Sequence, residues 1–199
     1  FTHNIIEIRK NAFCGCEVLN QIELQEGLVK IENTAFAKCR ELSDIEFPEG
    51  LKEIEASAFD NCSELRKIKI PSTVISIGYN GNGNSFSNCT KIEEIIVDNN
   101  NTQYDSRDNC NALIKTDTDT LILGSAKTKI PSTIKEIGFQ AFYGNESLAE
   151  LIIPEGVEKI GSNAFSNCKL IKNVVIPESV KDINFSQGII GNNPFYGCD

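Results

Sequence analysis

Phenylalanine recurs at a fixed spacing along this chain of 199 residues, and no other feature constrains its fold as strongly. Phe13, Phe36 and Phe59 are 23 residues apart, and each follows an alanine and precedes a cysteine by three residues. The same unit returns at Ser85-Phe86, Ala141-Phe142, Ala164-Phe165 and Pro194-Phe195. A period of this length is typical of stacked structural repeats. The sequence therefore predicts one solenoid over residues 1–199, built from roughly eight repeats.

A second string lies between the phenylalanine units and predicts a short strand. It has the form apolar-x-apolar-proline, as in Ile45-Glu46-Phe47-Pro48, Ile68-Lys69-Ile70-Pro71, Leu151-Ile152-Ile153-Pro154 and Val174-Val175-Ile176-Pro177. Alternation with a period of two indicates one buried face, and proline ends the strand because it has no N–H to donate. An apolar pair such as Leu51 and Ile54 then predicts a second inward-pointing segment. The spacing of Ala58, Phe59 and Cys62 predicts a single helical turn.

One coil of 23 residues cannot bury these apolar positions alone, but a stack of coils can. Neighbouring strands should then pair in parallel, with phenylalanine on phenylalanine and cysteine on cysteine. The predicted fold is a right-handed solenoid with a parallel β-sheet on its concave face. Short strands and single helical turns are expected elsewhere, with few or no long helices.

The period is interrupted in three places. The phenylalanine spacing lengthens from 23 to 27 residues between Phe59 and Phe86, and to 30 residues between Phe165 and Phe195. The extra residues, around 80–83 and 186–192, are expected to form loops on one flank. The largest departure is residues 98–129, which we call the insert. There, two apolar strings at 112–114 and 121–123 flank a polar stretch, which predicts a β-hairpin or two short strands in place of the normal turn.

The repeat resembles a known family. The match is clearest from Ile152-Ile153-Pro154 through Gly161 to Ala164-Phe165 and Cys168, which is similar to the BspA-like leucine-rich repeat of bacterial surface proteins. The string at 104–112 also resembles an insert common in such arrays from gut anaerobes. The resemblance covers nearly the whole chain, although Asn145 replaces a cysteine. It implies export, display at the bacterial cell surface and adhesion, without defining a ligand.

Six of the eight cysteines occupy one position of the repeat. In a stack they should point inward side by side, and parallel Cβ vectors suit a disulfide poorly, so buried free thiols are expected. The other two are Cys14 and Cys110. Cys14-Gly15-Cys16 is too short for the usual redox or zinc pair.

Charge and composition exclude several classes of function. The net charge of −9 and the pI near 4.8 argue against nucleic acid and anionic membrane surfaces as partners. No apolar run is long enough to insert into a membrane. The chain starts part-way through a repeat, which we interpret as a fragment of a longer array.

Catalysis and metal binding are not expected. The only histidine is His3, so a serine or cysteine nucleophile would lack its usual base. Gly81-Asn82-Gly83 lacks the ending of a phosphate-binding loop. Four aspartates of the insert could in principle bind calcium: Asp105, Asp108, Asp117 and Asp119. Their spacing does not match a calcium-binding loop, and aspartate is common in turns for its own hydrogen bonding. We therefore expect no enzyme activity, cofactor or metal.

The residue at the centre of each strand string should point outward. These positions, which we call the central column, are predicted to be Glu23, Glu46, Lys69, Ile96, Ile122, Ile152 and Val175. The preceding outward column stays polar at Gln21, Asp44, Lys67, Glu94, Thr120, Glu150 and Asn173. The C-terminal half should thus expose an apolar stripe with a polar rim, which is typical of interfaces. Two alternatives are that β-branched residues merely favour strands, or that the insert covers the stripe.

The expected function is a non-catalytic binding or adhesion module that recognises a protein or glycan through its concave face. The alternative is a structural spacer in a larger cell-surface protein. A spacer would need no apolar stripe, so the exposure of the central column separates the two. The ligand and the oligomeric state stay open at this stage.

Overall fold

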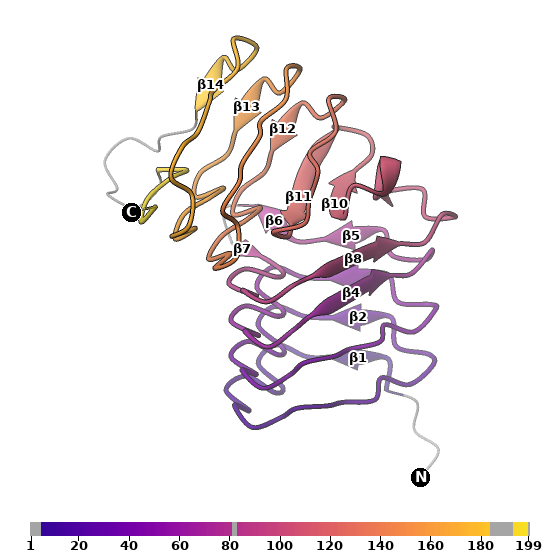
Figure 1. The fold of residues 1–199 in the computed structure, drawn as a ribbon. Coiled ribbons are helices and arrows are strands. Elements are labelled where there is room, and N and C mark those ends of the chain that lie inside the picture. The colour runs from indigo at the N-terminus through magenta and orange to yellow at the C-terminus, as the bar shows by residue number, and fades with distance from the viewer. Residues whose placement is uncertain (1–4, 81–82, 184–192, 199) are drawn as a thin grey trace.

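The computed structural model describes residues 5–80, 83–183 and 193–198 as a stack of coils. Each coil brings its short strand beside the equivalent strand of the coil before it (Figure 1). The first ladder joins β1 (Glu7–Ile8), β2 (Lys30–Ile31), β3 (Glu53–Ile54) and β5 (Ser76–Ile77) in parallel. The register places the isoleucines of these strands side by side. The predicted stacking in parallel is confirmed.

A second ladder continues in the C-terminal half. Its order is β14 (Asp182–Ile183), β13 (Lys159–Ile160), β12 (Glu136–Ile137), β11 (Thr120–Gly124), β10 (Ala112–Lys115) and β9 (Tyr104–Asp105). The strands from β11 to β14 pair in parallel, whereas β9, β10 and β11 pair antiparallel. Strands β1, β2, β3, β5, β12, β13 and β14 come from the second inward-pointing segment of their repeats, whereas β9, β10 and β11 belong to the insert.

The apolar-x-apolar-proline strings behave differently. Only β4 (Lys67–Ile70) and β8 (Glu94–Val97) form a ladder there among the described residues, in a register that runs from Lys67–Glu94 to Ile70–Val97. The string at 45–47 alternates in burial as predicted, with Glu46 exposed between two buried residues, but it has no strand pairing. The sheet predicted along these strings is therefore short.

The phenylalanine rings form two continuous stacks in the core. In the first, Phe13, Phe36, Phe59 and Phe86 follow one another at centroid distances of 5.0, 5.2 and 5.4 Å, with planes within 7° of parallel. In the second, Phe142, Phe165 and Phe195 follow at 5.1 and 5.3 Å. The ring spacing is set by the distance between paired strands, about 4.8 Å.

The chain around each phenylalanine is a series of tight turns, not a continuous helical turn. In the third repeat, Asp60 N–H donates to the Ser57 carbonyl and Cys62 N–H to the Phe59 carbonyl. Ser57 and Asn61 have φ of 56° and 60°, outside the right-handed helical region. The only helix in the described part of the chain is a 3-10 helix, Arg107–Asn109.

The thiols of the ladder cysteines point inward and are hydrogen bonded. Cys62 Sγ lies 3.2 Å from the Phe36 carbonyl, and Cys168 Sγ lies 3.0 Å from the Phe142 carbonyl. No disulfide joins the cysteines, and those at 39, 62, 89, 110 and 168 are buried. Cys16 was expected to be buried with the other ladder cysteines, but it is exposed. Five thiols link their coil to the preceding one through a hydrogen bond to its phenylalanine carbonyl, those of Cys39, Cys62, Cys89, Cys168 and Cys198.

The insert contains the predicted hairpin, with β10 paired to β11 and a register shift at Leu113/Ile114. Both of its faces are buried. Leu113 and Ile122 pack into the core of the N-terminal coils, whereas Ile114 and Leu121 pack into the core of the C-terminal coils. The hairpin therefore separates two hydrophobic cores.

The insert also changes the direction of the stack. Strands β12 to β14 run at a steep angle to β1, β2 and β5 (Figure 1). On the side of the phenylalanine turns the two halves lie close together, since Ser87 Oγ donates to Gln140 Oε1 at 3.0 Å. On the strand side the insert adds β9 and β10. The stack is therefore wider on the strand side than on the side of the phenylalanine turns, and this difference accounts for its change of direction.

Gly124 fills the phenylalanine position in the fifth coil. Its N–H donates to the Ala141 carbonyl at 2.9 Å, as Phe142 N–H donates to Ala164 in the next coil. A Cβ on Gly124 would lie 2.1 Å from the Phe142 ring, so no larger residue fits here. The phenylalanine stack is therefore broken at this coil.

The loop expected around 80–83 is framed by a small hairpin of β6 (Tyr79–Asn80) and β7 (Gly83–Asn84). Residues 81–82, the loop predicted at 186–192, and His3 lie outside the described residues.

We expect Phe59→Ala to destabilise the fold by about 3–5 kcal/mol. The Phe59 side chain is fully buried and has a stacked ring on each side, so its removal leaves a cavity that neighbouring coils cannot fill. Urea unfolding followed by circular dichroism measures the loss. A change below about 1 kcal/mol would show that the stack does not hold the coils together.

Candidate functional site

The central column is the predicted surface for a partner. The structure exposes Glu23, Glu46 and Lys69, as expected. Ile152 and Val175 are 80% and 79% exposed, which is unusual for branched apolar side chains. Ile96 is only half-buried. The exposed apolar part of the column is thus confined to two neighbouring coils.

Ile122 does not belong to this surface, and its predicted exposure is wrong. Its side chain is fully buried, in the core of the N-terminal coils. The register explains the error, since Thr120 and Leu121 of β11 pair with Glu136 and Ile137 of β12. Residues 120–124 therefore belong to the long ladder, not to the strand strings. Thr120, predicted to be outward and polar, is buried for the same reason.

Lys129 occupies the place in the central column that Ile122 was expected to fill. It is exposed between two less exposed neighbours, Thr128 and Ile130. After Pro131, Ile134 N–H donates back to the Pro131 carbonyl, as Val74 N–H does to Pro71. The match between Ile70-Pro71-Ser72-Thr73 and Ile130-Pro131-Ser132-Thr133 is the sequence signal that locates this string.

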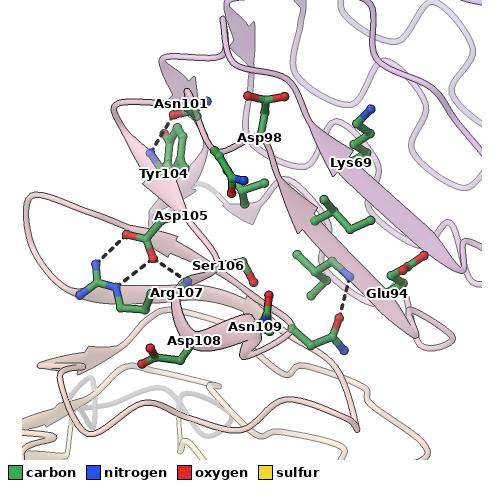
Figure 2. A pocket seen from close by; sticks show the side chains of 15 residues that line it. Lys69, Glu94, Asp98, Asn101, Tyr104, Asp105, Ser106, Arg107, Asp108 and Asn109 are labelled. Carbon is green, nitrogen blue, oxygen red and sulfur yellow. Dashed lines mark hydrogen bonds and ion pairs between the residues drawn. The ribbon is translucent and has the colours of Figure 1, made fainter.

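A hollow of about 700 Å³ lies between β8 and the first part of the insert (Figure 2). We call it the edge hollow. Lys69 and Ile96 of the central column line it on one side. The other walls come from 97–101, 104–109 and Asn111. The hollow cannot be predicted from the repeat pattern of the sequence, because it depends on the path of the insert.

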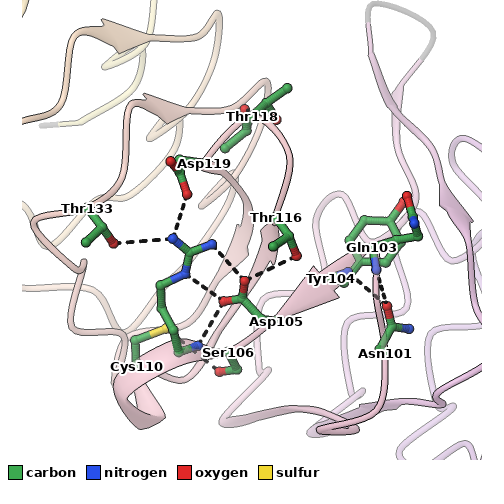
Figure 3. A network of polar contacts seen from close by, with 12 residues as sticks. Asn101, Gln103, Tyr104, Asp105, Ser106, Cys110, Thr116, Thr118, Asp119 and Thr133 are labelled. Carbon is green, nitrogen blue, oxygen red and sulfur yellow. Dashed lines mark hydrogen bonds and ion pairs between the residues drawn. The ribbon is translucent and has the colours of Figure 1, made fainter.

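Arg107 holds the insert in place through ion pairs with Asp105 and Asp119, and Figure 3 shows these two carboxylates. The Arg107 guanidinium donates two hydrogen bonds to Asp105, from Nε at 2.9 Å and from Nη2 at 2.7 Å. Nη1 donates to Asp119 at 2.6 Å. Partial burial favours the neutral form of Asp105, but the Arg107 hydrogen bonds outweigh it and lower the pKa of that carboxyl. Asp105 also raises the pKa of Arg107.

These contacts also account for the aspartates that were considered as calcium ligands. Asp105 and Asp119 pair with Arg107, and Asp117 lies 3.1 Å from Lys115 Nζ. Asp108 is exposed. Within residues 5–80, 83–183 and 193–198, no three acidic, histidine or cysteine side chains are grouped closely enough to hold a metal ion.

Two further hollows follow the same seam between the halves. One, of about 550 Å³, is lined by Arg66, Lys67, Glu93, Glu94, Asn111 and Lys127. Its charges pair locally, with Lys67–Glu94 and Lys127–Glu93 both at 2.8 Å. The other, of about 480 Å³, lies between residues 126–130 and 148–152 and includes Ile152. The seam therefore joins the edge hollow to the apolar part of the central column.

The thiols of Cys39 and Cys168 are unsuited to nucleophilic chemistry. Burial raises the pKa of Cys39 to about 12, and the pKa of Cys168 to about 12. A thiol with such a pKa stays protonated at neutral pH and donates to a carbonyl, whereas a nucleophile needs the thiolate. Their role is structural.

We expect Ile122→Asp to unfold the chain, and Ile152→Asp to leave its stability within about 0.5 kcal/mol. The first substitution buries a carboxylate between two apolar cores, and the second places it in water. Thermal unfolding of the two variants compares their stabilities with that of the wild type. Equal destabilisation would contradict the assignment of Ile122 to the core and Ile152 to the surface.

We expect Arg107→Gln to cost about 1–3 kcal/mol at pH 7, because it leaves two partly buried carboxylates without their cation. The lowered pKa of Asp105 contributes stability above the ordinary aspartate pKa of about 4, and this contribution is lost as the pH falls through the folded-state pKa. The difference between wild type and variant should therefore shrink at acid pH.

Urea unfolding at neutral and acid pH tests this. Arg66→Gln is the matched control, because Arg66 pairs with Glu93 at an exposed site. It should change stability by less than about 1 kcal/mol. A difference for Arg107→Gln that does not depend on pH would contradict the role given to Asp105.

Comparisons with known proteins agree with the geometry. Residues 1–114 and 124–199 match the model of the BspA type leucine rich repeat region, in six copies. Among curated proteins, none matches this chain. In the part of the chain that the structure describes, no helix has the length and hydrophobicity needed to span a bilayer.

Solved structures with the same fold come from bacteria. The pneumococcal vaccine antigen PcpA is 29% identical, with a TM-score of 0.68, over 77% of this chain and 38% of that one. A leucine-rich repeat protein from Eubacterium ventriosum is 24% identical, with a TM-score of 0.70, over 89% of this chain and 53% of that one. One from Bacteroides ovatus is 24% identical, with a TM-score of 0.57, over 98% and 45%.

The chain thus spans about half or less of the length of these relatives. The family match covers nearly all of the sequence and agrees with the stacked coils and their parallel ladders. The chain belongs to the BspA-type leucine-rich repeat family.

Proposed function

We propose that the chain is a non-catalytic binding module of a bacterial cell-surface protein, and that it recognises a partner protein through the exposed apolar part of the central column. The observation that carries the proposal is the exposure of Ile152 and Val175. They occupy equivalent positions of neighbouring coils, so their side chains form one apolar patch. Glu150 and Asn173 give it an exposed polar rim. Such a patch favours a contact surface.

Location at the cell surface is supported by the family and by its relatives. The name of PcpA describes a vaccine antigen, and a related structure from Faecalibacterium prausnitzii is described as a leucine rich cell surface protein. A spacer is the weaker proposal for this chain, because a spacer gains nothing from two exposed branched side chains. A glycan partner is also less favoured, because the patch is apolar.

The test is a solid-phase binding assay on a panel of immobilised extracellular-matrix proteins and bacterial surface proteins. We expect the wild-type chain to bind at least one of them, and the double variant Ile152→Asp/Val175→Asp to lose about tenfold or more in affinity, because two desolvated apolar contacts become charged. Both substitutions are at exposed positions, so the fold should persist.

The matched control is Glu23→Gln/Glu46→Gln, which changes the same column in the N-terminal half. This variant should keep most of the wild-type affinity. Binding that is unchanged by the aspartate substitutions, or lost equally in the control, would contradict the proposal. Absence of binding to every protein of the panel would also count against it.

A further inference from the structure

Strand β8 has one unpaired edge. It pairs with β4 on its other side, where Glu94 N–H donates to the Arg66 carbonyl and Asp98 N–H donates to the Ile70 carbonyl. Backbone groups of alternate residues in a strand point in opposite directions. Ile95 and Val97 therefore direct their N–H and C=O groups away from β4, towards the insert.

The insert satisfies only the first part of this edge. Ile95 N–H donates to Asn111 Oδ1 at 2.8 Å, and Asn111 Nδ2 donates to the Glu93 carbonyl at 2.9 Å. Among the described strands, β8 forms a ladder with β4 alone, although β10 also lies close to it. The Val97 part of this edge therefore has no ladder partner, and Val97 is only 7% exposed.

The edge hollow lies along this unpaired stretch. Residues 94–98 form one wall, and residues 104–109 face them. In a regular solenoid the next coil would place a strand beside β8, but here the chain leaves the ladder at Asp98. Its next apolar-x-apolar-proline string is displaced, with Lys129 N–H bonded to the Cys110 carbonyl of the insert. One strand position beside β8 is therefore not supplied by the next coil.

The charged side chains that line the edge hollow indicate which side chains a partner strand would carry. Four carboxylates line it, from Glu94, Asp98, Asp105 and Asp108, against two cations, from Lys69 and Arg107. Glu94 pairs with Lys67, and Asp105 pairs with Arg107. Asp98 and Asp108 form no ion pair within the described part of the chain. A strand with basic side chains would complement them.

We propose that the edge hollow accepts an extended, basic segment of a partner protein, which adds to β8 as a further strand. The segment accepts a hydrogen bond from Val97 N–H and donates to the carbonyls of Ile95 and Val97, while its lysine or arginine side chains meet Asp98 and Asp108. Main-chain hydrogen bonds supply the affinity and the side chains supply the selectivity. This inference rests on the proposed function and names the class of partner segment.

The experiment uses the full chain labelled with ¹⁵N and a capped hexapeptide of alternating valine and lysine as the probe. With the peptide at about 1 mM, we expect amide exchange at Val97 to slow by about tenfold or more. The amides of Glu94 and Asp98, already bonded to β4, should change little. A peptide in which glutamate replaces lysine should give no protection, and neither should one with alternating proline, which cannot donate.

Variants of the acidic wall test the selectivity. Asp108→Asn should weaken the lysine peptide about two- to fivefold, as expected for an exposed ion pair. Asp44→Asn is the matched control, because Asp44 is exposed and does not line the hollow, and it should leave affinity unchanged. Unchanged exchange at Val97, or equal protection by the glutamate peptide or by maltotriose, would overturn the inference.

The two assays distinguish failure of this inference from failure of the proposed function. The variant Ile152→Asp/Val175→Asp should still bind the lysine peptide and protect Val97. If Val97 is not protected while the panel assay still detects a partner that needs Ile152 and Val175, only the inference fails. If the panel assay detects no such partner while Val97 is protected, the proposed role of the central column fails.

Discussion

Each coil of this protein is stable only against its neighbours, and the phenylalanine stacks are where that dependence is strongest. A ring such as Phe59 has a parallel ring on each side, at the spacing that the strand ladders impose. The cysteine three residues later hydrogen bonds to the phenylalanine carbonyl of the preceding coil, so stacking and hydrogen bonding fix the same register. Because every inward position repeats, a substitution in the core of one coil alters its packing against the coils on both sides.

The insert meets this constraint by replacing a coil with a hairpin that is buried on both sides. Leu113 and Ile122 face one core, and Ile114 and Leu121 face the other, so neither half is left with exposed apolar surface at the joint. Asn84 contributes a polar link across the same joint. Its Oδ1 accepts from Phe86 N–H, which has no carbonyl of a following coil to bond, and its Nδ2 donates to the Ile122 carbonyl at 2.8 Å.

The periodic part of the fold could be predicted from the sequence, because each repeat has the same spacing of phenylalanine, cysteine and strand residues. The stacked coils, the inward thiols and the hairpin at 112–123 all followed from spacing and alternation. Ile122 could not be placed in this way. Its string, Leu121-Ile122-Leu123, is apolar throughout, like the strand string Leu151-Ile152-Ile153, and only the pairing of Leu121 with Ile137 shows that it belongs to the other ladder. The same applies to the edge hollow, since the path of residues 98–111 depends on tertiary contacts such as those of Arg107.

In a regular solenoid each strand edge is covered by the next coil, so specific recognition must come from side chains alone. An interruption of the repeat removes the neighbouring strand of the next coil. Backbone donors and acceptors on the strand edge can then form hydrogen bonds with another chain. Here the interruption also supplies the wall that faces the free edge and the carboxylates at its rim. The edge hollow and the second hollow share Glu94 and Asn111, and the second and third hollows share Lys127, so the series ends at Ile152. A partner strand at β8 would thus run towards the exposed apolar pair, so one extended segment can contact both surfaces.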